Sequence, residues 1–325
     1  MNDPLLDPLL RFWPVAGPVV LDGGLATELE RRGHDLRDDL WSARLLRDDP
    51  AAVRDTHLSF FRAGAQVATT ASYQASFEGF AAAGLSRAEA AGLMRASVTL
   101  AREAAETADE EAAEAGGGAV RRVVAASVGP YGAVRADGSE YNGDYGVTDG
   151  FLREFHGPRM EVLAAAGADV LALETIPSEQ EATVLLGLLD EMPGDTLAWL
   201  SLTCADATST RRGEDVSRVA ALARHADRVV AVGVNCTAPE HVGRLVQSVV
   251  AASGKSAVVY PNSGETWDAV TRTWGGNGAG VDPVAAAGWV AAGARLVGGC
   301  CRVGSEDIAR LAVAIGPGRA TDGAG

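Results

Sequence analysis

Short apolar runs alternate with amphipathic stretches along this 325-residue chain. The runs show little apolar–polar alternation, which is typical of parallel strands buried on both faces. They predict strands at 19–23, 65–72, 122–128, 168–174, 197–204, 229–235, 256–260 and 294–299. Helical patterns separate most of these runs and predict helices at 50–63, 86–115, 150–166, 178–192, 215–227, 238–253, 283–292 and 305–315.

The same short sequence connects a helix to the following strand at three places in the chain. Helical stretches end in Ala-Gly-Ala at 63–65, 166–168 and 292–294 and run straight into a strand. Glycine just past a helix end adopts the left-handed cap conformation and lets the chain turn at once into the sheet. Eight alternating units of this kind predict a single-domain α/β fold, the closed (β/α)8 TIM barrel. We expect the barrel to occupy residues 1–316 and the tail 317–325 to be disordered.

A doubly wound open sheet is the alternative fold. It normally carries a GxGxxG fingerprint after its first strand, and residues 21–26 here read Leu-Asp-Gly-Gly-Leu-Ala, which does not match.

Composition limits the classes of partner. The net charge of −15 disfavours binding to a phosphate backbone, so we expect no nucleic-acid partner. No apolar run approaches the ~20 residues that span a bilayer, so we expect no membrane association. Because the N-terminus has no signal-peptide pattern and cysteines are few, we expect a cytoplasmic protein.

The cysteines offer the most specific chemistry. Cys300 and Cys301 are adjacent and follow a glycine pair, while Cys236 and Cys204 each end a strand-like run. Neighbours on a strand point to opposite faces, so adjacent cysteines share a target only where glycines make the backbone irregular. Three thiolates from two strand ends form the ligand set of an open zinc site. A strained vicinal disulfide or inert buried thiols are the alternatives.

Two acids fall at strand ends that a barrel brings to one mouth. Asp22 could simply cap a helix that starts near Leu25. Glu174 is a poor N-cap residue and interrupts an apolar strand before Pro177, which makes a plain capping role harder to accept. Carboxylates and thiolates converging on one mouth strengthen the zinc interpretation.

Competing barrel chemistries fit less well. The five histidines form no HxH pair and fall in helical or loop stretches, which disfavours an amidohydrolase-type metal site. A Schiff-base aldolase needs a lysine on a strand, whereas Lys255 lies in a turn before a strand and is expected to be solvated. Two long polar stretches, 131–149 and 261–282, follow strand ends. They are either lids and substrate walls or flexible decoration.

From about residue 19 to 311 the chain resembles the zinc-dependent homocysteine S-methyltransferases that use S-methylmethionine or S-adenosylmethionine. The matching segments are 21–30, 40–43, 72–76, 128–133, 174–177, 233–240, 260–265 and 298–302. The resemblance implies a TIM barrel, one Zn²⁺ per chain held by Cys236, Cys300 and Cys301, and methyl transfer from a sulfonium donor to homocysteine to give methionine.

The resemblance also implies contacts with homocysteine. Asp22 and Glu174 would hold its ammonium group, and the backbone N–H groups of Gly23 and Gly24 would bind its carboxylate. Further residues would line the pocket: Tyr73 and Asn235, with Trp41 either facing the sulfonium or serving as plain packing.

Two departures from the family pattern matter. Val-Gly at 303–304 replaces a frequent Thr-Pro, which loosens the start of the last helix. The chain also shows neither the C-terminal arm of betaine-using relatives nor folate and cobalamin domains, so we expect a sulfonium donor, with S-methylmethionine preferred. Another thiol or selenol acceptor, a betaine donor, and a non-catalytic zinc or thiol sensor stay open as alternatives, as does the oligomeric state (monomer or homodimer).

Overall fold

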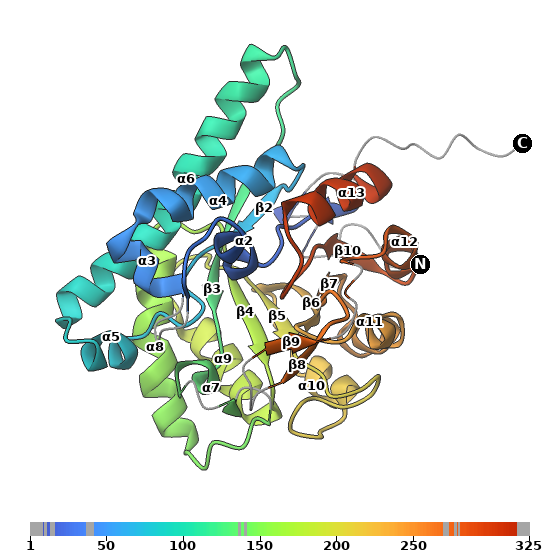
Figure 1. The fold of residues 1–325 in the computed structure, drawn as a ribbon. Coiled ribbons are helices and arrows are strands. Elements are labelled where there is room, and N and C mark those ends of the chain that lie inside the picture. The colour runs from blue at the N-terminus through green and yellow to red at the C-terminus, as the bar shows by residue number, and fades with distance from the viewer. Residues whose placement is uncertain are drawn as a thin grey trace, which may run out of the picture.

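The computed structural model describes residues 9, 12–13, 17–36, 42–135, 138–139, 142–268, 273–275, 278 and 280–316. Eight parallel strands form one sheet in the order β1-β10-β7-β6-β5-β4-β3-β2 (Figure 1). The sheet closes between its first and last strands, because Gln66 N donates to Val20 O (2.7 Å) and Asp22 N donates to Val67 O (3.1 Å). The predicted TIM barrel is thereby confirmed.

The barrel strands are short and follow the predicted apolar runs. They are β1 (Val19–Val20), β2 (Val67–Thr69), β3 (Val123–Val128), β4 (Val170–Ile176), β5 (Ala198–Leu202), β6 (Val229–Asn235), β7 (Ala257–Tyr260) and β10 (Ala294–Val297).

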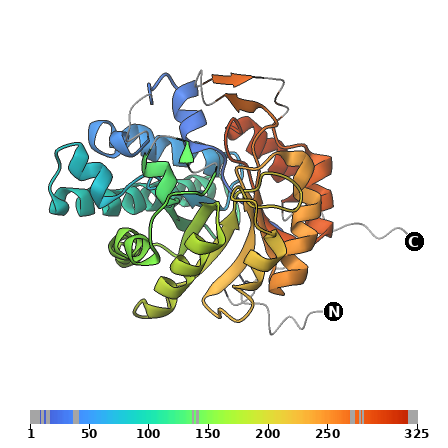
Figure 2. The same cartoon turned by 90° about the horizontal axis from the view of Figure 1, so that it is seen from below.

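Helices cover the outside of the strands (Figure 2). Those predicted from the sequence are α4 (Pro50–Arg62), α6 (Arg87–Glu114), α8 (Asp149–Ala165), α9 (Glu179–Glu191), α10 (Val216–Ala221), α11 (Pro239–Ser253), α12 (Pro283–Ala291) and α13 (Ser305–Ile315). The C-terminal part of α6 extends beyond the barrel (Figure 1).

The core has two apolar layers, because successive residues of each strand point to opposite faces of the sheet. Val19, Ala125 and Trp199 belong to the cluster inside the barrel, whereas Val20 and Leu200 belong to the cluster between the sheet and the helices. Each strand therefore buries both faces, which explains the near-continuous apolar runs in the sequence.

Some local predictions were wrong. α10 ends at Ala221 instead of residue 227, because the backbone tightens into i→i+3 hydrogen bonds from Leu222 N to Val219 O and from Ala223 N to Ala220 O. Lys255 is buried instead of solvated: its Nζ donates to Ala226 O (3.1 Å) at the end of the barrel where β7 begins. Short helices at α2 (Leu25–Arg31), α3 (Ser42–Asp48), α5 (Phe77–Ala82) and α7 (Tyr131–Arg135) complete the helical layer.

Both long polar stretches carry structure. The first contains α7, and Tyr145 OH donates to Glu181 Oε2 of α9 (3.1 Å), which ties the stretch to the helical layer. The second contains an antiparallel hairpin, β8 (Thr266–Asp268) and β9 (Thr273–Gly275), at the top edge of the molecule in Figure 2.

No helix in the described ranges is both long enough and apolar enough to cross a membrane. The predicted tail at 317–325 lies outside the described residues.

Candidate metal and substrate site

Three cysteine sulfurs meet at the carboxyl ends of β6 and β10. The Sγ atoms of Cys236, Cys300 and Cys301 all lie within 4.8 Å of one another. Cys301 Sγ is 3.9 Å from Cys236 Sγ and 3.9 Å from Cys300 Sγ. The structure therefore brings together the three cysteines expected from the sequence.

Backbone contact explains why glycines surround this site. Gly299 N donates to Asp22 O (3.1 Å) and Gly24 N donates to Val303 O (2.9 Å), so the segments after β1 and β10 run against each other. A Cβ on Gly24 would lie 2.5 Å from Cys300 O, and one on Gly298 would lie 2.6 Å from Asp22 O. Only glycine permits this approach.

The sulfur spacing fits a tetrahedral metal ion. Metal–sulfur bonds of about 2.3 Å at the tetrahedral angle place sulfur ligands about 3.8 Å apart. The observed 3.9 Å separations match this edge and are far too long for a disulfide, so the four cysteines, Cys204 included, are free thiols. The hydrogen bond with Cys236, and further burial, raise the pKa of Cys300 well above its ordinary value. A raised pKa favours the neutral thiol, so a bound cation would be needed to hold these three groups as thiolates near neutral pH.

Cys204 does not share this position. Its side chain is buried in the core between sheet and helices, and its backbone N donates to Thr237 Oγ1 (3.0 Å). Burial raises the pKa of Cys204 to about 12, so it behaves as an apolar core residue.

Asp22 sits at the end of β1 and does not cap the next helix. Its carboxylate accepts hydrogen bonds from Thr69 N (2.7 Å) and Thr69 Oγ1 (3.0 Å), whereas the N-cap of α2 is Gly24, without a side-chain cap. Burial raises the pKa of Asp22 to about 8, against the lowering effect of the Thr69 hydrogen bonds. The negative charge of Glu174 raises it further, which places the two acids near each other.

Glu174 lies near the end of β4 and is 6 % exposed. Ser127 Oγ and the Tyr260 hydroxyl both hydrogen-bond to its carboxylate, and Trp199 Nε1 donates to the Tyr260 oxygen (3.1 Å). Burial raises the pKa of Glu174 to about 7. Its charge also acts on Cys236, so it belongs to the same mouth as the thiols.

Asn235 is hydrogen-bonded to its neighbours in the barrel. Its Oδ1 accepts from Thr175 N (2.8 Å) and Ser201 Oγ (2.8 Å), and its Nδ2 donates to Thr175 Oγ1 (2.7 Å). The side chain thus joins the ends of β4, β5 and β6. Glu174 directly precedes Thr175, and Cys236 directly follows Asn235. The hydrogen bonds between Asn235 and Thr175 therefore help to fix the positions of Glu174 and Cys236 relative to each other.

The remaining expected residues are placed as follows. The Gly24 N–H is already paired with Val303 O, so this donor does not fit the expected carboxylate contact. The Tyr73 ring packs over Gly129: a Cβ atom added to Gly129 would lie only 2.6 Å from Cδ2 of Tyr73. Buried Arg159 donates to Tyr73 O (3.0 Å) and fixes the loop that carries Tyr73. Trp41 lies outside the described residues.

Sequence reasoning gave no role to several residues that organise the site. Thr69, Ser127 and Tyr260 lie at or beside strand ends, and this position could have marked them as candidates. Their hydrogen bonds to the carboxylates of Asp22 and Glu174 depend on which strands are neighbours in the barrel. Arg159 lies on α8 and has no local signal, since its acceptors are carbonyls of distant loops.

The fold and the site define a (β/α)8 barrel with three converging thiols and two buried acids at its mouth. The model of the homocysteine S-methyltransferase family matches residues 19–315. A homocysteine S-methyltransferase of Bacillus subtilis (strain 168) is 45% identical over 308 residues, covering 94% of this chain and 97% of its own. The chain belongs to the homocysteine S-methyltransferase family.

Further relatives agree with this assignment. A homocysteine S-methyltransferase of Escherichia coli (strain K12) is 47% identical, covering 90% of this chain and 94% of its own. A selenocysteine methyltransferase of Astragalus bisulcatus is 38% identical, with 95% of each chain covered. Among solved structures, the metallated form of the homocysteine methyltransferase MmuM from Escherichia coli superposes with a TM-score of 0.83 at 43% identity, covering 94% of this chain and 99% of that one.

Proposed function

We propose that this protein transfers a methyl group from a sulfonium donor to the sulfur of L-homocysteine and so forms methionine, with one zinc ion bound per chain. The observation that carries the proposal is the meeting of three thiols within 4.8 Å of one another at the mouth that also holds Asp22 and Glu174. The family assignment and the metallated solved relative support it.

Cys236, Cys300 and Cys301 would hold the zinc ion and leave a fourth position open. When bound, the ion would lower the pKa of the homocysteine thiol and keep it as a thiolate near neutral pH. The chain's own contribution is the placement of three sulfurs with the spacing that such an ion needs. The three thiols work only when reduced, which fits the cytoplasmic location expected from the sequence.

Asp22 and Glu174 would recognise the substrate ammonium. Among the described residues, no lysine or arginine forms an ion pair with either carboxylate, and burial raises both pKa values. A cationic ligand would supply the missing counter-charge and favour the ionised carboxylates. A non-catalytic thiol sensor has no need of this pair of buried acids.

The reaction needs no strong general base. The homocysteine thiolate attacks the methyl carbon of the donor, a new S–C bond forms, and the old S–C bond breaks with its electrons on the leaving sulfur. The sulfonium departs as a neutral thioether, so no proton has to be delivered to it. The site residues therefore bind and orient the reactants.

A methyl-transfer assay on the zinc-loaded protein tests this proposal. We expect methionine to form from homocysteine and a sulfonium donor, and activity to disappear after zinc removal and return on its addition. A parallel arm with selenocysteine tests the acceptor named for the Astragalus bisulcatus relative. Faster methylation of selenocysteine than of homocysteine would overturn the proposed acceptor, and no transfer to either would overturn the activity.

A further inference from the structure

The residue that follows the cysteine pair has an unusual backbone. Arg302 has φ 66°, in the left-handed region that side chains other than glycine rarely adopt. This conformation lies directly after Cys301, so it sets the direction in which the chain leaves the cysteine pair. Strain of this kind persists only where the surroundings enforce it.

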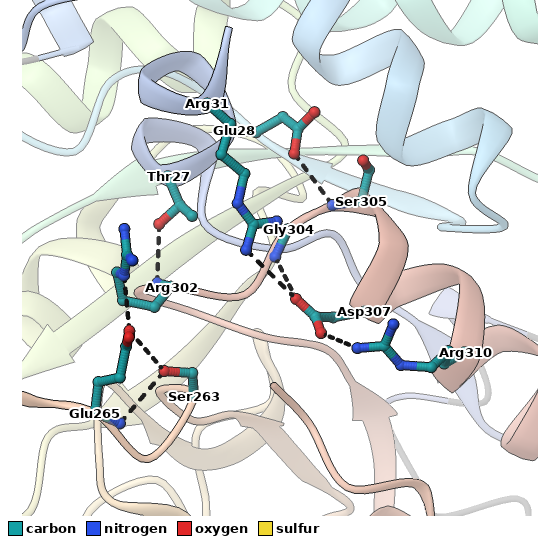
Figure 3. A network of polar contacts seen from close by, with 10 residues as sticks. All are labelled: Thr27, Glu28, Arg31, Ser263, Glu265, Arg302, Gly304, Ser305, Asp307 and Arg310. Carbon is teal, nitrogen blue, oxygen red and sulfur yellow. Dashed lines mark hydrogen bonds and ion pairs between the residues drawn. The ribbon is translucent and has the colours of Figure 1, made fainter. Parts of the chain in front are cut away.

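Contacts from two other segments enforce it (Figure 3). Thr27 Oγ1 of α2 accepts the hydrogen bond of Arg302 N (2.9 Å). Glu265 Oε2, in the segment before β8, accepts from Arg302 Nε (2.7 Å). Both the backbone and the side chain of Arg302 are therefore fixed from outside its own loop.

The segment that carries Glu265 runs beside the cysteine pair. Cys300 N donates to Pro261 O (2.8 Å), and Ser263 N donates to Cys301 O (3.1 Å). The Glu265–Arg302 ion pair is the third contact in this series, and Ser263 Oγ also donates to Glu265 Oε2 (3.3 Å). Residues 261–265 thus form a cradle for residues 300–302.

We propose that Arg302 is a positioning residue for the metal site, held in its left-handed conformation by Thr27 and Glu265 so that Cys300 and Cys301 are preorganised to bind zinc. This inference rests on the proposed zinc site and not on the methyl-transfer reaction. It gives the 261–282 stretch, through Glu265, a direct part in metal affinity.

A second set of contacts in Figure 3 provides the matched control. Asp307 caps the start of α13 by accepting from Gly304 N (2.8 Å) and forms an ion pair with Arg310. Arg310→Gln removes an arginine–carboxylate pair of the same network without touching Arg302.

The test measures the zinc dissociation constant of the full chain by competition with a chromogenic chelator. Loss of a hydrogen-bond partner that orients metal ligands typically costs 10–100-fold in affinity. We expect Thr27→Val and Glu265→Gln each to weaken zinc binding by about tenfold. Arg310→Gln should leave it within about twofold, because an exposed ion pair contributes little.

The backbone part of the proposal has its own test. Arg302→Ala and Arg302→Gly both remove the ion pair, but only glycine adopts positive φ without strain. We expect the glycine variant to bind zinc about two- to fivefold more tightly than the alanine variant.

The outcomes separate this inference from the proposed function. A merely structural role would lower the thermal midpoint of the metal-free variants and leave zinc affinity unchanged. Wild-type zinc affinity in both Thr27→Val and Glu265→Gln would overturn the inference. Wild-type protein that binds no zinc would overturn the zinc-dependent function itself.

Discussion

At the scale of single residues, backbone strain marks the site. Thr175, Cys236 and Arg302 are the non-glycine residues with positive φ in the described part of the chain. Each is a proposed metal ligand or directly follows a proposed ligand or substrate contact. A β-branched residue such as Thr175 is especially disfavoured there, so the Asn235 hydrogen bonds must hold it. Strain concentrated in this way is typical of functional sites.

The cysteines give the first prediction. Cys236→Ala removes one of three sulfurs, so the purified variant should lose most of its zinc, whereas Cys204→Ser should keep one ion per chain. X-ray absorption of the wild type should show about three Zn–S contacts near ~2.3 Å, and homocysteine should add a fourth. Full zinc occupancy in Cys236→Ala, or zinc loss in Cys204→Ser, would contradict the ligand assignment.

Glu174 gives the second prediction. Glu174→Gln preserves the shape and removes the charge that would face the substrate ammonium. A charge-assisted hydrogen bond contributes ~1.5–3 kcal/mol, so kcat/KM for homocysteine should fall by about ten- to a few hundred-fold. Zinc content should not change. Glu191→Gln, on the exposed end of α9, is the matched control and should leave kcat/KM unaltered. Abolished turnover with an unchanged KM would indicate a direct chemical role for Glu174.

At the scale of elements, the ends of β4, β5 and β6 are joined by one side chain. Asn235 was expected to line the substrate pocket, yet its amide oxygen is occupied by Thr175 N and Ser201 Oγ. The structure therefore favours a role in strand geometry for this residue.

This leads to a third prediction. Asn235→Ala removes the buried acceptor of the Thr175 N–H and the Ser201 hydroxyl and releases the strained Thr175 backbone. The free energy of unfolding should fall by about 2–4 kcal/mol, since each buried unsatisfied donor costs about 1–3 kcal/mol. Urea denaturation measures this change, and Ser201→Ala, which removes only one donor, should cost less. Unchanged stability with a raised KM for homocysteine would restore the pocket-lining role.

Helix α4 provides a fourth prediction, on pH. His57 is fully buried, and neither ring nitrogen has a hydrogen-bond partner among the described residues. Burial lowers its pKa from 6.5 to about 4. Between these values the unfolded chain binds a proton that the folded protein excludes. Above pH 6.5 His57 is neutral in both the folded and the unfolded state, and the protein has its full stability. As the pH falls from 6.5 toward 4, protonation of the unfolded chain lowers the free energy of unfolding by about 3 kcal/mol.

The difference between wild type and His57→Leu isolates this effect. The variant should be relatively more stable the lower the pH within that window, measured by urea denaturation at pH 6.5, 5.5 and 4.5. His225→Gln, at an exposed position, should follow the wild type. A constant difference across the window would show that His57 does not titrate as its burial requires.

At the scale of the whole molecule, the sequence predicted what depends on local periodicity. Eight apolar runs and the Ala-Gly-Ala joints were enough for the barrel, and a barrel brings strand ends such as those of Cys236 and Cys301 together. What escaped prediction depends on contacts between distant segments. The Glu265–Arg302 pair joins residues 37 positions apart, and Arg159 reaches a carbonyl 86 positions away. No pattern within one element encodes such partners.

The fifth prediction concerns the methyl donor and follows from the charge of the mouth. Two buried carboxylates and the proposed three-thiolate zinc centre favour a cationic donor over a neutral or anionic one. Sulfonium donors leave as neutral thioethers, whereas betaine must expel an amine, which is a poorer leaving group. S-adenosylmethionine also needs an apolar wall for its adenosine, and residues 275–280, Gly-Gly-Asn-Gly-Ala-Gly, offer no such side chains. In a competition assay at equal concentrations we expect S-methylmethionine to be consumed first, S-adenosylmethionine second and betaine last. Betaine outpacing both sulfonium donors would overturn the leaving-group argument, while faster transfer from S-adenosylmethionine would overturn only the order of the first two.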